Sequence, residues 1–134
     1  MKYSRLKITL FLLVCAATLV LGTLPQNVAV HMTPSDKIDH FAAFAVLMII
    51  GLVAFSPHDY LWLGLGLIGF GGLIEALQAI PSLNRSPDVF DWLVEVAAVL
   101  LFGGIGFAVN VWQKHLSKNQ RAEMASGIAK AYII

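Results

Sequence analysis

The sequence predicts an all-α fold, a membrane bundle of four transmembrane helices with both termini in the cytoplasm. Composition is the first reason: 58% of the 134 residues are hydrophobic, 13% are charged, and the mean hydropathy is +0.78. A soluble domain of this length needs a charged surface that such a composition does not provide. The other two reasons are the lengths of the apolar stretches and the positions of the basic residues.

Four apolar stretches have lengths that suit membrane spans. They cover about residues 6–24, 38–55, 60–80 and 89–112. A helix rises about 1.5 Å per residue, so roughly 20 residues cross a hydrocarbon core about 30 Å thick. We therefore expect residues 1–113 to form one four-helix transmembrane domain.

The two ends of the chain leave alternatives open. Lys2, Arg5 and Lys7 before the first stretch also suit a signal peptide. The apolar run is long and no clear cleavage site follows it, so we expect a retained helix. Residues 114–134 are expected to form a cytoplasmic tail, either an interfacial helix on the inner membrane surface or a solvated segment.

Basic residues predict the orientation, because they concentrate in cytoplasmic segments. Seven of the nine lie before the first span or after the last: Lys2, Arg5, Lys7, Lys114, Lys118, Arg121 and Lys130. Only Lys37 and Arg85 lie in the loops on the opposite side. We therefore expect a multi-pass protein of the bacterial inner membrane, with the loops at 25–37 and 81–88 facing out.

Polar residues collect at the outer ends of the last three predicted helices. Short connections make consecutive helices antiparallel neighbours, so these residues should meet at one depth and form a pocket open to the outer face. This polar cluster has eight predicted members: Asp36, Lys37, His40, Glu75, Gln78, Arg85, Asp91 and Glu95. Ionisable groups within spans are energetically unfavourable and usually mark functional sites.

Helix capping accounts for some of these acids. Aspartates at predicted helix starts, such as Asp88, are favourable there because they cap backbone N–H groups and complement the helix dipole. Capping does not account for Glu75, near the end of its helix, or for Glu95, nearly two turns into its own. For Glu75 the sequence leaves two readings, a structural ion pair with Arg85 or Lys37 and a functional role.

Small residues in the third stretch predict close helix packing. Gly69, Gly72, Ala76 and Ala79 recur at spacings of three and four and share one face with Glu75. Such a face lets another backbone approach, which is how membrane helices associate without a hydrophobic driving force.

Several classes of site are not expected. The four histidines are too far apart in the sequence for a metal motif, and Cys15 is the only cysteine, so no metal site and no disulfide is predicted. The glycine-rich stretches lack the lysine of a phosphate loop, and no cofactor is predicted. No basic patch with stacking aromatic residues indicates nucleic acid. No known catalytic signature is present, which leaves open whether the chain is an enzyme.

Three segments resemble motifs of the VanZ-like membrane proteins. Residues 36–41, DKIDHF, resemble the family's D-K-x-x-H-F motif. Residues 72–78, GLIEALQ, resemble G-x-x-E-x-x-Q, and residues 85–91, RSPDVFD, resemble its R-S…D segment. The similarity covers about residues 36–106, in the same order on three successive helices. The chain departs from the family at Glu95, where Asn is usual, and three residues further on, where it has Ala in place of Gly.

The resemblance implies a small polytopic protein of the cell envelope. The founding member of the family is linked to reduced susceptibility to glycopeptide antibiotics, especially teicoplanin. We therefore expect the pocket to bind or modify an envelope component, such as a lipid headgroup or a lipid-linked cell-wall intermediate. One alternative is a small proton-coupled carrier, which would need a polar path to the cytoplasmic side. Another is a non-catalytic scaffold or assembly factor. Membrane lipids are the expected partners, and a membrane-protein partner or a homo-oligomer is left open.

Overall fold

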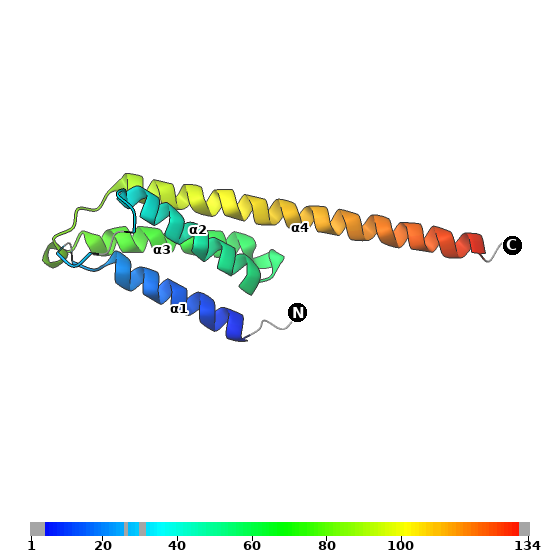
Figure 1. Ribbon diagram of the computed structural model, residues 1–134, viewed down its shortest axis with the longest axis horizontal. Helices are drawn as coiled ribbons and strands as arrows, with labels where there is room; N and C mark the ends of the chain where they lie inside the picture. The colour runs from blue at the N-terminus through cyan, green and yellow to red at the C-terminus, as the bar shows by residue number, and fades with distance from the viewer. Residues whose placement is uncertain (1–4, 26, 30–31, 132–134) are drawn as a thin grey trace.

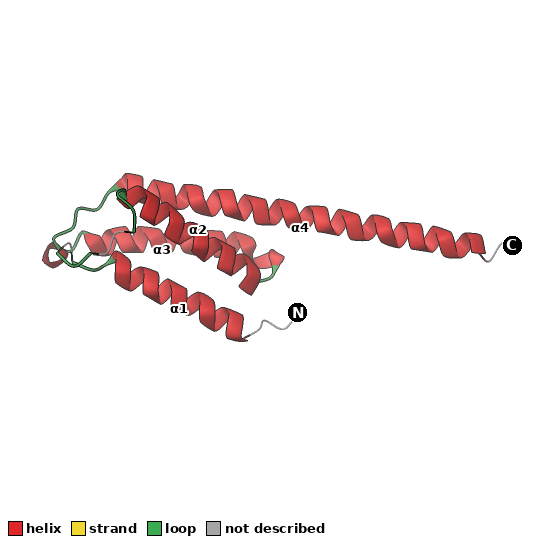
Figure 2. Ribbon diagram, in the orientation of Figure 1, coloured by secondary structure: helices red, strands yellow, loops and turns green. Residues whose placement is uncertain are grey.

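The chain forms four α-helices and two short 3₁₀-helices (Figure 2). The computed structural model describes residues 5–25, 27–29 and 32–131, with side chains as far as residue 126, and this part contains no strand. The α-helices are α1 (Arg5–Gly22), α2 (Asp36–Ala54), α3 (Tyr60–Gln78) and α4 (Val89–Ala131). The 3₁₀-helices are η1 (Pro57–Asp59), between α2 and α3, and η2 (Pro81–Leu83), after α3. The predicted all-α class is confirmed.

Consecutive helices run antiparallel, as their short connections predict (Figure 1). One end of the bundle holds the α1–α2 loop, η2 and the start of α4. At the other end η1 joins α2 to α3, α1 begins, and α4 continues past its neighbours. Both ends of the described chain therefore lie on the same side of the bundle.

The core lies mainly between α2, α3 and α4. The most extensive contacts are those of α2 with α4, and α1 packs chiefly on α2. Phe44, Leu47 and Met48 of α2 and Ile74 of α3 are almost completely buried. In α1 only Phe11 is buried, so α1 is a peripheral helix attached to a three-helix core.

The outer surface of the bundle is strongly apolar. Side chains such as Leu61, Trp62, Leu100 and Phe107 are each more than 60% exposed. All four α-helices are long and apolar enough to cross a membrane. A contiguous apolar surface of this kind is unfavourable in water and suits a lipid environment. The predicted spans are confirmed as helices of suitable length and composition for a membrane protein.

The last helix is longer than the sequence predicts. We expected a span ending near residue 112 and a separate tail, but α4 continues without a break to Ala131. Its 43 residues measure about 64 Å, roughly twice the thickness of a hydrocarbon core. Residues 111–126 are all exposed and extend beyond the other helices (Figure 1). This segment is therefore a direct continuation of α4.

Glycines allow the closest helix contacts at positions other than the predicted Gly69 and Gly72, although a Cβ atom at Gly72 would lie 3.5 Å from Trp92. A Cβ atom at Gly51 would lie 2.6 Å from Leu63, and one at Gly103 would lie 2.9 Å from Met48. At Gly69 a Cβ atom would meet no other heavy atom of the described chain within 4 Å. The face of α3 around Gly69 is therefore an outer face.

The buried stripe of α3 follows its larger residues. It consists of Leu63, Leu67, Gly71, Ile74, Glu75 and Gln78. Large apolar side chains fill the space between helices better than a run of glycine and alanine does, because they gain more van der Waals contact. Of the predicted small-residue face, Glu75 is buried and Gly72 is half-buried, whereas Gly69, Ala76 and Ala79 are exposed.

Candidate functional site

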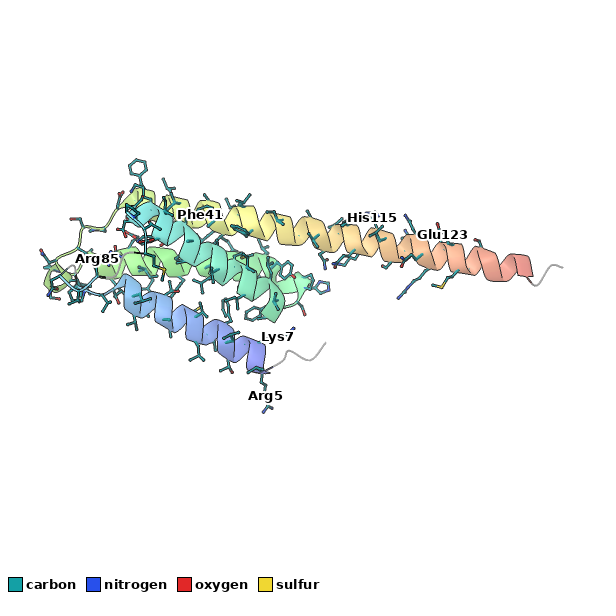
Figure 3. The ribbon with its side chains drawn as sticks, viewed as in Figure 1. Arg5, Lys7, Phe41, Arg85, His115 and Glu123 are labelled. Atoms are coloured by element: carbon teal, nitrogen blue, oxygen red, sulfur yellow. The ribbon has the colours of Figure 1, made fainter. Side chains whose placement is uncertain are left out.

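All eight residues of the polar cluster lie at the end of the bundle that holds the α1–α2 loop. They come from the start of α2, the end of α3, the η2–α4 connection and the start of α4. Figure 3 shows Arg85 at this end, near the C-terminal end of α1. Within the cluster His40, Glu75, Gln78, Asp91 and Glu95 are buried. His40, Glu75 and Glu95, which come from three different helices, lie close to one another.

The innermost contact of the cluster joins His40 and Glu95. His40 Nδ1 lies 2.6 Å from Glu95 Oε1, which is a hydrogen-bond distance, and Glu95 is completely buried. Gly71 on α3 makes room for this carboxylate, because a Cβ atom at that position would overlap Glu95 Oε2. Glu95 therefore has no role as a helix cap; it links α4 to α2 through His40.

Glu75 stabilises the start of a neighbouring helix. Its Oε2 accepts a hydrogen bond from the backbone N–H of Asp88, at 2.9 Å, immediately before α4. The first N–H groups of a helix lack partners within the helix and lie at the positive end of its dipole, so a carboxylate is favourable there. In the described part of the chain Glu75 forms no ion pair with Arg85 or Lys37. Of the two readings that the sequence left open for Glu75, the ion pair is therefore not the one that the described residues form.

Lys37 joins α2 to the start of α4. Its ammonium group lies 2.7 Å from Asp88 Oδ2 and 2.8 Å from Asp91 Oδ1. Asp88 also caps α4 by accepting a hydrogen bond from the Phe90 N–H at 2.8 Å. The sequence predicted this capping role for Asp88 but did not include it in the cluster.

The two hydrogen bonds to Asp88 have a consequence for its charge. The hydrogen bonds from the Lys37 ammonium and the Phe90 N–H hold the pKa of the Asp88 carboxyl below its usual range. Because the pKa is lower in the folded state, the resulting stabilisation is present above the ordinary carboxyl pKa, about 3.9. It is lost as the pH falls through the lowered value.

Gln78 and Arg85 attach α1 to the other helices. Gln78 Nε2 donates to the Gly22 carbonyl at 2.8 Å, and Arg85 Nη1 lies 3.2 Å from the same oxygen and 3.5 Å from the Leu24 carbonyl. The last carbonyls of a helix have no partner within the helix. These two side chains therefore satisfy the C-terminal end of α1, which has few buried contacts of its own.

Replacing Arg85 with alanine is expected to loosen α1. Hydrogen bonds to charged groups contribute about 1.5–3 kcal/mol, so local opening of α1 should become about tenfold more frequent or greater. Cys15, the single cysteine, is half-buried on α1 and reports this opening through its rate of reaction with a thiol reagent. Arg121→Ala, in the exposed part of α4, is the control. Equal labelling rates in the two variants would contradict the role given to Arg85.

A cavity of about 560 Å³ lies between α1 and α2. Its polar end is lined by Asp36, Asp39, His40, Arg85 and Glu95. The remaining walls are mostly apolar and come from residues 13–21 of α1 and 42–46 of α2. The cavity is thus polar next to the loops and apolar toward the middle of the bundle.

Half of the predicted pocket residues line this cavity. Four cluster members, Lys37, Glu75, Gln78 and Asp91, are not in the lining and instead connect the helices. The contribution of α1 to the wall was not predicted from the sequence. Residues 10–17 of α1 are entirely apolar, so they carry no polar signal that could have indicated it.

Comparison of the whole chain with protein-family models, with curated proteins and with solved structures finds no match of any of these three kinds.

Proposed function

We propose that the chain is a VanZ-like integral protein of the bacterial inner membrane that binds an amphiphile of the cell envelope in the cavity between α1 and α2. Both termini are cytoplasmic in this proposal, and the polar cluster lies at the outer surface. The basic residues support this orientation, since seven of the nine lie in the sequence near the N-terminus or after the last apolar stretch.

The change in polarity along the cavity is the observation that carries the proposal. Charged groups line the end beside the loops, and residues 42–46 and 13–21 line the part at membrane depth. A lipid in the outer leaflet has the same arrangement, with its headgroup near the surface and its chains below. The volume of about 560 Å³ lies within the range of ligand sites, roughly 300–1,000 Å³.

The charged lining indicates the chemistry of the headgroup. Arg85 is the basic side chain of the lining, and a guanidinium group suits phosphate because its N–H groups match the phosphate oxygens. Arg85 Nη2 has one acidic neighbour, Asp36 Oδ2 at 3.7 Å, which leaves this nitrogen able to contact a ligand. The acids of the lining accept hydrogen bonds, so they suit hydroxyl or amino groups. A phosphate that carries a sugar or an amino alcohol meets both requirements.

The cavity does not favour a proton-coupled carrier. Polar groups line only one end, and the core below them consists of side chains such as Phe44, Leu47 and Met48. A carrier would need a polar path across the membrane. The geometry therefore favours binding at one membrane face.

The proposal is tested by filling the cavity. Ala43 lines the cavity on α2, and Ala43→Phe should exclude the apolar chain of a ligand. Protein purified in mild detergent from bacterial membranes should retain a phosphate-containing lipid, measured by native mass spectrometry. Its occupancy should fall about tenfold or more in Ala43→Phe, a loss of at least about 1.4 kcal/mol in binding.

The matched control is Ala76→Phe, which adds the same ring on an exposed face of α3. It should retain lipid as the wild-type chain does. Circular dichroism establishes that both variants are helical. Equal lipid occupancy in the two variants, or no retained lipid in the wild-type protein, would rule out the cavity as the binding site.

A further inference from the structure

Three buried side chains from three helices lie close to one another beside the polar end of the cavity. His40 of α2, Glu75 of α3 and Glu95 of α4 each offer one ligand atom, and these atoms all lie within 4.8 Å of one another. The three residues are 9%, 8% and 0% exposed. Two ligands of one ion, each about 2.1 Å from it, lie about 3–4 Å apart, so small shifts would bring all three to a common ion.

In each of the two carboxylates, one oxygen takes part in a hydrogen bond and the other has no hydrogen-bond partner among the described residues. Glu75 Oε2 is held by the Asp88 N–H and Glu95 Oε1 by His40 Nδ1. Glu75 Oε1 and Glu95 Oε2 are buried and form no hydrogen bond to any residue that the structure describes. A buried carboxylate oxygen with no donor is unfavourable, and it needs a proton or a cation.

The basic side chains of the cluster do not supply that cation. Lys37 is held by Asp88 and Asp91, and Arg85 by Asp36 and backbone carbonyls of the α1 end. In the part of the chain that the structure describes, neither contacts Glu75 or Glu95. With neutral His40 the three-residue group carries two negative charges, which a divalent cation would balance.

We infer that His40, Glu75 and Glu95 form a binding site for a divalent metal ion. One imidazole nitrogen and two carboxylate oxygens form a donor set that suits Zn²⁺ or Mn²⁺. His40 and Glu95 also line the cavity, so an oxygen from water or a ligand can complete the coordination. This metal site does not depend on whether an amphiphile binds.

The geometry distinguishes this site from a second group of possible ligands. Asp36, His40 and Asp91 also lie close together, but Asp36 faces Arg85 and Asp91 is bonded to Lys37. Those acids are already compensated by basic groups. The inner group is not, and the ion therefore belongs with Glu75 and Glu95.

The metal replaces the hydrogen that joins His40 and Glu95. At 2.6 Å these atoms are closer than two ligands of one ion, so binding must separate them slightly, and the hydrogen of neutral His40 must then lie on its other ring nitrogen. Protons compete with a metal ion for imidazole and carboxylate ligands. Affinity should consequently be weaker at pH 5.5 than at pH 7.5. The sequence analysis expected no metal, because the ligands come from three helices and form no local motif.

The test is metal titration of the full chain in detergent after removal of bound metal with a chelator. Isothermal titration calorimetry with Zn²⁺, and separately with Mn²⁺, should give one ion per chain for at least one of the two metals. Glu75→Gln and Glu95→Gln should each reduce the affinity at least about tenfold, since each removes a charged ligand. Asp91→Asn should bind as the wild-type chain does. No binding to the folded wild-type chain, affinity unchanged in both glutamine variants, or a loss confined to Asp91→Asn would overturn the assignment.

A second measurement decides the case even if a variant fails to fold. X-ray absorption spectroscopy of the wild-type chain with one equivalent of Zn²⁺ should show only nitrogen and oxygen ligands, with a single imidazole. Sulfur, or two or more imidazoles, in the coordination shell would place the ion elsewhere and overturn the assignment.

Discussion

Replacing Gly71 with alanine is expected to destabilise the bundle by about 3 kcal/mol. The added Cβ atom would overlap Glu95 Oε2 and lie 3.2 Å from Phe44. Overpacking typically costs about 1–3 kcal/mol. Here the displaced group is a completely buried carboxylate, and its displacement would also disrupt the hydrogen bond to His40. Unfolding of the purified protein with increasing denaturing detergent provides the measurement.

Gly69→Ala is the matched control for this experiment. It makes the same chemical change in the same helix, but its Cβ atom meets nothing within 4 Å in the described chain. Alanine is a better helix former than glycine by about 1 kcal/mol, so Gly69→Ala should be neutral or slightly stabilising. If the two variants unfold alike, or if Gly69→Ala is the more damaging, the described packing of α3 against α4 is incorrect.

Replacing His40 with leucine is expected to cost about 3–5 kcal/mol. This variant leaves Glu95 buried without its partner, and removing one member of a buried pair has an effect of this size. The double variant His40→Leu/Glu95→Leu should recover most of the loss, because it removes both polar groups and keeps similar volumes. The unfolding measurements require a chelator, so that bound metal does not contribute to the stability of the wild-type protein.

Lys37→Met is the comparison for the buried pair. Lys37 also joins α2 to α4, and its side chain is 47% exposed, whereas that of its partner Asp91 is 7% exposed. Exposed ion pairs contribute only about 0–1 kcal/mol, and a pair with one buried member should contribute more than that but less than the fully buried pair. A smaller effect for Lys37→Met than for His40→Leu would confirm that burial decides the strength of these contacts. Failure of the double variant to recover stability would show that Glu95 is held by something other than His40.

Much of the fold follows from local properties of the sequence. The four apolar stretches predicted α1, α2 and α3 to within about two residues at each end, because length and composition alone mark a helix that can cross a membrane. The end of α4 was not predicted. Residues 113–131 contain no proline, and a change from apolar to polar side chains does not end a helix.

The members of the polar cluster were predictable, but their partners were not. Antiparallel neighbours necessarily bring His40, Glu75 and Glu95 to one end of the bundle. Which side chain Glu75 meets depends on how α3 is rotated about its axis, which the sequence does not specify. The ion pair with Arg85 or Lys37, one of the two readings that the sequence left open, is not formed among the described residues, and the hydrogen bond to the start of α4 was not foreseen.

By itself, the sequence determined that this chain forms long apolar helices and that its charged groups gather at one end, because hydrophobicity and connection length are local properties. The tertiary structure alone decided the pairing of His40 with Glu95, the space left by Gly71 and the cavity against α1. Each of these depends on the rotation and separation of helices that are far apart in the chain. Those quantities are fixed by the packing of many side chains together, and no short segment encodes them.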